Sequence, residues 1–312
     1  MVTYRMPRIL VHGPEDPRLA EYRGVREADL VRAAGLFVAE GRLVVERVIR
    51  DGRFAIRSIL LNRAACRALE PQLEDLSPAV PIYICETDAC SDMMGFHLHR
   101  GCLALVRRPR PIPLSTLLGT ARRLIALEAV GNPDNVGGVF RNAAAFGADA
   151  VLLSPTTCDP LYRKAIRTSM AATLQVPFCR AERWPDVLGD VAARFTVVAL
   201  TTRAPAITID EFVAQGLPDR LALLVGSEGA GLSAVAEASA ACRVRIPIRP
   251  EVDSLNLAVA VGIALSRVDY SVAGGGMASH STARENSQSG QENKLDDHPV
   301  GAQHREKLNG ER

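Results

Sequence analysis

The sequence lacks the patterns that mark membrane and secreted proteins. No apolar run among its 312 residues approaches the roughly 20 residues that span a bilayer. The first 16 residues contain no signal-peptide core, so we expect a cytoplasmic protein without a membrane partner. Hydrophobic residues make up 47% of the chain, which is enough to give each of two ordinary domains a core.

Signatures of common ligand and catalytic sites are missing as well. The chain has neither G-x-G-x-x-G nor GxxxxGK[ST], and these motifs need glycines at fixed places against phosphate, so NAD and P-loop nucleotides are disfavoured. Cys90, His97, His99 and Cys102 lie close together, but their spacing fits no standard zinc finger. We therefore expect no metal and reduced thiols. No nucleophile triad is apparent, which argues against hydrolase chemistry.

Charge leaves the partner open. The formal net charge is only +2, so bulk electrostatics neither requires nor excludes a polyanion. Arginine clusters at 107–110 and 122–123 suit phosphate contacts, but they fit equally well as solvated charges beside a linker.

The first part of the chain predicts a small α/β unit. Residues 1–27 are rich in proline and charge and resemble an arm. Within 28–106, apolar runs indicate strands at 36–39, 56–61, 80–85 and 101–106, with helices from 43 onward and over 64–73. Alternating elements of this kind are typical of an α/β domain.

A second α/β unit follows a proline-rich linker at 107–118. Over 119–273 the pattern predicts strands at 123–129, 150–153, 195–200 and 221–225, and helices at 136–146 and 161–170. A last helix at 257–270 is apolar on nearly every side, so we expect it to be buried between partners. Residues 274–312 are polar and poor in large apolar residues, which predicts a disordered tail.

Three blocks of the second unit place polar residues at the mouths of apolar runs: 132–141, 225–233 and 246–256. Polar groups at strand ends are where α/β sheets bind ligands. Asn135 lies where a helix N-cap is wanted, and Ser254 is a plausible N-cap of the last helix. Glu228 stands between glycines, where it could fix a hydroxyl or an arginine, or could belong to a solvated turn.

In order, these blocks resemble the SpoU/TrmH family of RNA ribose 2′-O-methyltransferases, of the SPOUT class. The first block resembles the family motif N-P-x-N-x-G-x-x-x-R-x-A, the second resembles G-x-E-x-x-G-L-S, and the third resembles I-P-x(7)-S-L-N. The segment 167–171 is similar to the family's R-x-S-x-G-A, with Ala171 in place of the glycine. Residues 37–41 resemble the start of the ribosomal-protein-like RNA-binding domain that precedes many SpoU domains.

The resemblance implies an α/β protein in which a trefoil-knotted SPOUT methyltransferase domain follows a small RNA-binding domain. It implies S-adenosylmethionine as the cofactor and a ribose 2′-hydroxyl of structured RNA, rRNA or tRNA, as the acceptor. Family members are typically homodimers. By the resemblance, mainly backbone groups hold the cofactor, at Leu200, Thr201, Gly226, Ile246 and Leu255.

The resemblance also implies a catalytic group, Arg141, assisted by Asn135, Glu228, Ser254 and Asn256. An arginine is a very weak base because its pKa exceeds about 12. We therefore expect Arg141 to position a phosphate and to stabilise the developing alkoxide. Whether it also takes the proton stays open. Two alternatives also stay open: a non-catalytic RNA-binding protein with a relict cofactor pocket, and a base methyltransferase of the same class.

Overall fold

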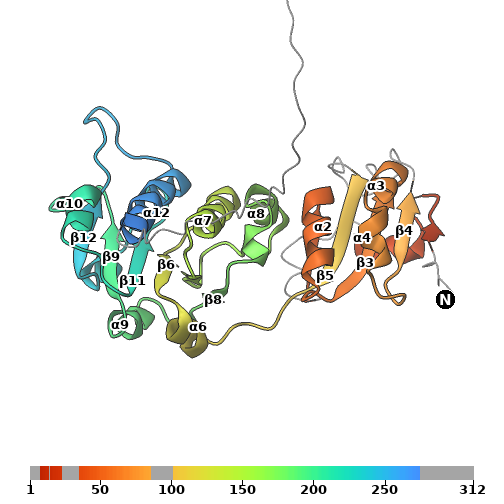
Figure 1. Ribbon diagram of the computed structural model, residues 1–312, viewed down its shortest axis with the longest axis horizontal. Coiled ribbons are helices and arrows are strands. Elements are labelled where there is room, and N and C mark those ends of the chain that lie inside the picture. The colour runs from red at the N-terminus through yellow and green to blue at the C-terminus, as the bar shows by residue number, and fades with distance from the viewer. Residues whose placement is uncertain (1–7, 14, 23–34, 86–100, 275–312) are drawn as a thin grey trace, which may run out of the picture. The chain divides into compact units, whose positions relative to one another are not determined.

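The computed structural model describes residues 8–13, 15–22, 35–85 and 101–274. Its strands form two sheets, one of five strands in the N-terminal part and one of seven strands in the C-terminal part (Figure 1). The predicted tail after Gly274, like Cys90, His97 and His99, lies outside the described residues.

The N-terminal sheet is mixed. Its order is β1-β4-β3-β5-β2; β1, β4 and β3 run parallel, whereas β5 pairs antiparallel with both β3 and β2. Each of the four strands predicted here is present, and the sheet gains β1, which the sequence pattern did not predict. The strands are β1 (Arg8–Leu10), β2 (Leu36–Glu40), β3 (Ile56–Asn62), β4 (Ile82–Cys85) and β5 (Cys102–Arg107).

Short helices cover both faces of this sheet. The 3-10 helix η1 (Pro17–Tyr22) buries Leu19 and Tyr22 against one face, so part of the predicted arm belongs to the core. The opposite face packs against α2 (Arg42–Asp51), α3 (Arg63–Ala68) and α4 (Glu70–Glu74). The single helix predicted over 64–73 is wrong: it divides at Leu69, with Pro71 in the first turn of α4, where proline is tolerated.

The C-terminal sheet is parallel throughout, in the order β10-β12-β9-β11-β6-β7-β8. The last strand, β12, lies between β10 and β9 rather than at an edge, so the chain returns into the sheet before its final helix. The trefoil knot implied by the resemblance stays a prediction. The strands are β6 (Arg123–Leu127), β7 (Ala150–Leu153), β8 (Phe178–Arg180), β9 (Thr196–Leu200), β10 (Ile207–Thr208), β11 (Leu221–Val225) and β12 (Cys242–Arg245).

Helices cover both faces of the parallel sheet, because successive residues of β6, β7, β9 and β11 alternate between two cores. On one face α7 (Pro133–Ala145) and α12 (Leu257–Gly274) lie side by side, and α10 (Ile209–Ala214) packs against α12 (Figure 1). The other face is covered by α6 (Leu114–Thr120), α9 (Val187–Ala192) and α11 (Ala234–Ala238). Two short helices, α8 (Arg163–Thr168) and η4 (Ala172–Leu174), connect β7 to β8.

The segment after α8 contains Ala171, which stands where the family motif has a glycine. Met170 and Ala171 both have left-handed backbones, with φ of 53° and 65°, a region that costs an L-residue roughly 1–2 kcal/mol. Ala171 is fully buried in the core beneath the N-terminal sheet. The chain therefore keeps the backbone turn that a glycine would adopt without strain.

Among the described residues, no helix is long and apolar enough to cross a membrane. Cys66, Cys102, Cys158, Cys179 and Cys242 form no disulfide, but Cys85 is disulfide-bonded, so the expectation of reduced thiols is wrong at that residue.

Candidate active site

A cavity of about 670 Å³ opens where β9 and β11 end, beside the start of α12. Because the strands are parallel, their carboxyl ends meet at this edge of the sheet. The volume is in the range of small-molecule and cofactor pockets. Its walls include all five residues predicted to hold the cofactor and three of those predicted to act in catalysis: Leu200, Thr201, Gly226, Ile246, Leu255, Glu228, Ser254 and Asn256.

The loop after β11 forms one wall and folds tightly back on itself. The Gly231 amide donates to the Ser227 carbonyl over 3.0 Å. A Cβ on Gly226 would stand 2.2 Å from the Gly231 carbonyl carbon, closer than real Cβ atoms come. Gly229 and Gly231 have φ of 86° and 70°, which glycine adopts without strain. Glycine at these positions therefore makes the loop, and a ligand can approach its main chain closely.

A chain of side-chain hydrogen bonds connects this loop to α7. The Asn256 amide donates to the Asn135 side-chain oxygen over 2.8 Å and to a Glu228 carboxylate oxygen over 3.2 Å. Asn256 Oδ1 also accepts from the amides of Ala258 and Val259, over 3.0 and 3.2 Å. One side chain thus caps α12 and joins residues from all three sequence blocks.

The helix caps differ from the sequence expectation. Asn132, not Asn135, caps α7, by accepting from the Asp134 amide over 2.9 Å. Pro133 fits directly after it because the first helical position needs no amide hydrogen. Likewise Asn256, not Ser254, caps α12. Ser254 is exposed at the cavity.

Asn135 is instead a buried polar residue, 3% exposed, in the first turn of α7. Its oxygen accepts from Asn256, whereas its side-chain nitrogen has no hydrogen-bond partner among the described residues. Beside it, the Asp134 carboxylate forms an ion pair with the Lys164 ammonium at 2.7 Å and accepts a hydrogen bond from the Thr168 hydroxyl over 2.9 Å. The hydrogen bond from Lys164, assisted by that from Thr168, lowers the pKa of the Asp134 carboxyl.

Arg141 does not line the cavity. It lies with Gly138 and Asn142 on the outer side of α7, in a second hollow of about 500 Å³ completed by Val259 and other residues of α12. Its side chain is exposed and has no hydrogen bond or ion pair with the described residues. Val259, a large apolar residue in the same hollow, is 51% exposed. We call this hollow the α7/α12 groove.

Sequence reasoning missed the side chains that support the cavity. Glu128 and Ser233 connect the end of β6 to the end of the glycine loop, and Arg203 bonds to the same loop from the β9 side. No motif indicates these pairings. The one available signal is position, since Glu128 directly follows the buried strand β6 and Arg203 lies three residues after the end of β9. The arginines of the basic clusters are partly structural: Arg108 pairs with Asp159 at 2.8 Å and Arg123 donates to backbone carbonyls.

The fold and the cavity together define an α/β protein that binds a small molecule at the carboxyl ends of a parallel sheet, without phosphate-binding glycine motifs. Residues 122–266 match the model of the SpoU rRNA methylase family. Over 256 residues, 80% of this chain and 88% of the relative, the protein is 38% identical to an uncharacterized tRNA/rRNA methyltransferase of Mycobacterium bovis. The chain belongs to the SpoU rRNA methylase family and is an RNA methyltransferase.

Two other relatives extend the comparison. The 23S rRNA (guanosine(2553)-2′-O)-methyltransferase of Bacillus subtilis is 28% identical over 231 residues, which are 73% of this chain and 86% of that protein. The AdoMet-bound rRNA methyltransferase of Sinorhizobium meliloti has the same fold, with a TM-score of 0.71 at 23% identity over 84% of this chain and 97% of that one.

Proposed function

We propose that the protein transfers a methyl group from S-adenosylmethionine to a ribose 2′-hydroxyl of rRNA or tRNA. The observation that carries the proposal is the cavity itself, which gathers the predicted cofactor residues at one sheet edge and attaches their loop to α7 through Asn256. The name of the B. subtilis relative, a 2′-O-methyltransferase, supports the ribose as acceptor.

The walls of the cavity suit this cofactor. Leu200, Ile246 and Leu255 offer apolar surface for a purine ring. The main chain around Gly226 and the carboxylate of Glu228 offer polar partners for a ribose and an amino-acid tail. The bound cofactor would supply an electrophilic methyl group.

The protein must then orient the hydroxyl and stabilise its developing charge. In our proposal Arg141 contacts the RNA phosphate and that charge, whereas Asn135, Glu228, Ser254 and Asn256 shape the polar end of the cavity. Glu228 and Asn256 are held by their mutual hydrogen bond at 3.2 Å. Arg141 is not held by any described residue, so RNA or a second copy of the chain has to complete its position.

A homodimer is the second part of the proposal. One face of α12 is buried in this chain, whereas Val259 on its outer side is 51% exposed beside Arg141. A symmetric contact through the α7/α12 groove would cover this apolar surface. It would also bring Arg141 of one copy toward the other copy. We further propose that the N-terminal sheet domain selects the RNA.

Mapping of the transferred methyl group tests the reaction. Unmodified total RNA is incubated with the protein and methyl-labelled S-adenosylmethionine, then digested with alkali, which needs a free 2′-hydroxyl to cleave. We expect the label in alkali-resistant dinucleotides, and mass spectrometry then locates the nucleotide. Label on a base would replace the proposal by a base methyltransferase. No label, together with no cofactor binding by calorimetry, would favour the non-catalytic RNA-binding protein.

A further inference from the structure

The glycine loop of the cavity depends on side chains outside it for its shape. Gly229 and Ala230 are exposed, and within the loop the Gly231 amide bonds to Ser227. Glycine-rich segments lose more conformational entropy on ordering than other segments. A wall of the cavity built from such a segment is therefore well formed only where other groups hold its main chain.

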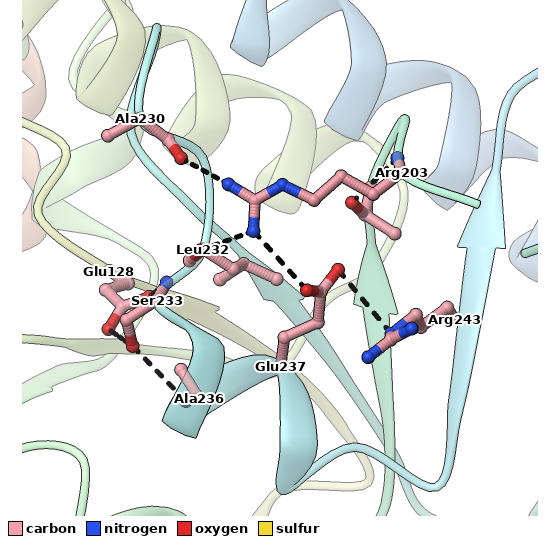
Figure 2. A network of polar contacts seen from close by, with 9 residues as sticks. Glu128, Arg203, Ala230, Leu232, Ser233, Ala236, Glu237 and Arg243 are labelled. Carbon is pink, nitrogen blue, oxygen red and sulfur yellow. Dashed lines mark hydrogen bonds and ion pairs between the residues drawn. The ribbon is translucent and has the colours of Figure 1, made fainter. Parts of the chain in front are cut away.

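Arg203 holds the loop from the β9 side. One guanidinium nitrogen, Nη2, donates to the Ala230 carbonyl over 2.8 Å, and the other, Nη1, donates to the Leu232 carbonyl over 3.1 Å. The planar guanidinium presents these donors in a fixed fork, which a lysine ammonium does not reproduce. Figure 2 shows the side chain of Arg203 reaching across to both carbonyls.

Glu237 holds Arg203 in turn. Its carboxylate is 6% exposed, in α11, and lies 3.4 Å from Arg203 Nη1. The second oxygen lies 3.6 Å from Arg243 Nε, so two arginines share one buried carboxylate (Figure 2). Only one of the two touches the loop: Arg203 lines the cavity, whereas Arg243 does not.

The far end of the loop is fixed independently. The buried carboxylate of Glu128 accepts from the Ser233 amide over 2.8 Å and from its hydroxyl over 2.7 Å. The Trp184 indole donates to the same carboxylate over 2.8 Å. Because this end stays fixed without Arg203, loss of Arg203 should loosen the segment from 229 to 232 rather than unfold the whole edge of the sheet.

We infer that Arg203 is a positioning residue for cofactor binding: it holds the glycine loop in the shape that the cofactor needs. The inference rests on the proposed function, because it assumes that S-adenosylmethionine occupies the cavity. Because Arg203 orders the loop before the cofactor binds, the conformational entropy that ordering costs is not lost in the binding step. Without Arg203, the loop loses this entropy when the cofactor binds, so binding weakens, whereas the groups that act on RNA keep their positions.

Calorimetry with S-adenosylmethionine tests the inference on the full chain. We expect Arg203→Ala to raise the Kd about tenfold or more, the size expected for loss of charge-assisted hydrogen bonds. Arg243→Ala is the matched control, since it removes the other ion pair of Glu237 without touching the loop, and its Kd should stay within about twofold. Arg203→Lys keeps the charge but not the fork, so it should fall between wild type and Arg203→Ala.

Kinetics separates positioning from general destabilisation. With RNA saturating, Arg203→Ala should raise the KM for the cofactor while kcat at saturating cofactor stays near that of wild type. If Arg203→Ala does not fold, Glu237→Gln, which loosens Arg203 without removing it, should raise the Kd by a smaller factor. An equal Kd in wild type, Arg203→Ala and Glu237→Gln, or a fall in kcat without a change in KM, would overturn the inference. A wild-type protein that does not bind the cofactor would instead overturn the proposed function.

Discussion

The cofactor cavity and the α7/α12 groove lie in one domain but are built differently. The cavity is lined by strand ends and main chain, and its glycine loop is held from two sides by Arg203 and Glu128. The groove is shallow and partly apolar, and its Arg141 is unattached. In our proposal, one chain forms the methyl-donor site by itself, whereas Arg141 needs RNA or a second copy of the chain to complete its position.

Substitution of Arg141 should have the largest effect on methyl transfer, and it should alter the α7/α12 groove without altering the cofactor cavity. We expect Arg141→Ala to reduce methyl transfer about 100- to 1,000-fold, the size typical for removal of a group that stabilises developing charge. Turnover is measured with labelled cofactor and total unmodified RNA. Asn142→Ala is not a suitable control because Asn142 bonds to the Ala258 carbonyl; Arg245→Ala, an exposed arginine on β12, is the better choice. Near-normal turnover of Arg141→Ala would sink the assignment.

Gly226→Ala should have a large effect on the cofactor cavity. The new methyl group would stand 2.2 Å from the Gly231 carbonyl carbon, so the loop has to move. We expect at least about a hundredfold weaker cofactor binding in calorimetry. Gly189→Ala, at a position in α9 with open space around it, is the control and should bind normally. Unaltered binding by Gly226→Ala would show that the loop is not the wall we describe.

A mixture of the two inactive variants tests whether separate chains supply the two regions. If Arg141 acts on the partner's cavity, a mixed dimer of Arg141→Ala and Gly226→Ala has one complete site. Random exchange in an equal mixture should then restore about a quarter of wild-type activity. Light scattering should show a dimer at micromolar concentration. A monomer would contradict the dimer, and no recovery from a proven mixed dimer would contradict the shared site.

Asn256→Ala should have a moderate effect because Asn256 connects the cavity to α7. It removes the hydrogen bonds to Asn135 and Glu228 and the cap of α12. We expect about 1 kcal/mol of lost stability from the cap and a roughly tenfold fall in kcat. Thermal unfolding and turnover are both measured. Asn256→Ser, which keeps a capping oxygen, should recover the stability that the cap contributes but not the activity, and recovery of the activity would contradict the bridging role.

The smallest effect is expected at Ala171. Glycine would relieve the left-handed strain, worth roughly 1–2 kcal/mol. It would also lose a buried methyl group and give the unfolded chain more freedom, and each of these two changes destabilises the protein by up to roughly 1 kcal/mol. These terms nearly cancel. Chemical denaturation should therefore show a change in unfolding free energy below about 1 kcal/mol, and a change above 2 kcal/mol would contradict the balance.

The sequence predicted those features that depend on local residue pattern or on the order of motifs. Strands such as β6, β7 and β11 are continuous apolar runs, so they could be expected. The motif order also grouped the second and third blocks, which line one cavity, with the first block, which joins them through Asn135. The parallel order, with β12 between β10 and β9, follows from long-range packing that no local pattern encodes. Short elements such as β8, β10 and α11 carry too few residues for a periodic signal.

The helix caps and the side chains that hold the glycine loop show most clearly what the sequence could not predict. Asn132 and Asn135 are both suitable cap residues three positions apart, and only the backbone decides between them. The pairing of Glu128 with Ser233 and that of Arg203 with Ala230 span 105 and 27 residues, so composition and spacing give no sign of either. Arg141 matched its motif, but its place away from the cavity could come only from the structure.

The most direct test measures cofactor binding and methyl transfer on the same Arg141→Ala preparation. Our account predicts that calorimetry gives the wild-type Kd for S-adenosylmethionine, because Arg141 lies outside the cavity, while single-turnover transfer to RNA is almost abolished. A variant that loses binding and transfer together would contradict the separation of the two regions, and one that keeps both would contradict the catalytic role of Arg141.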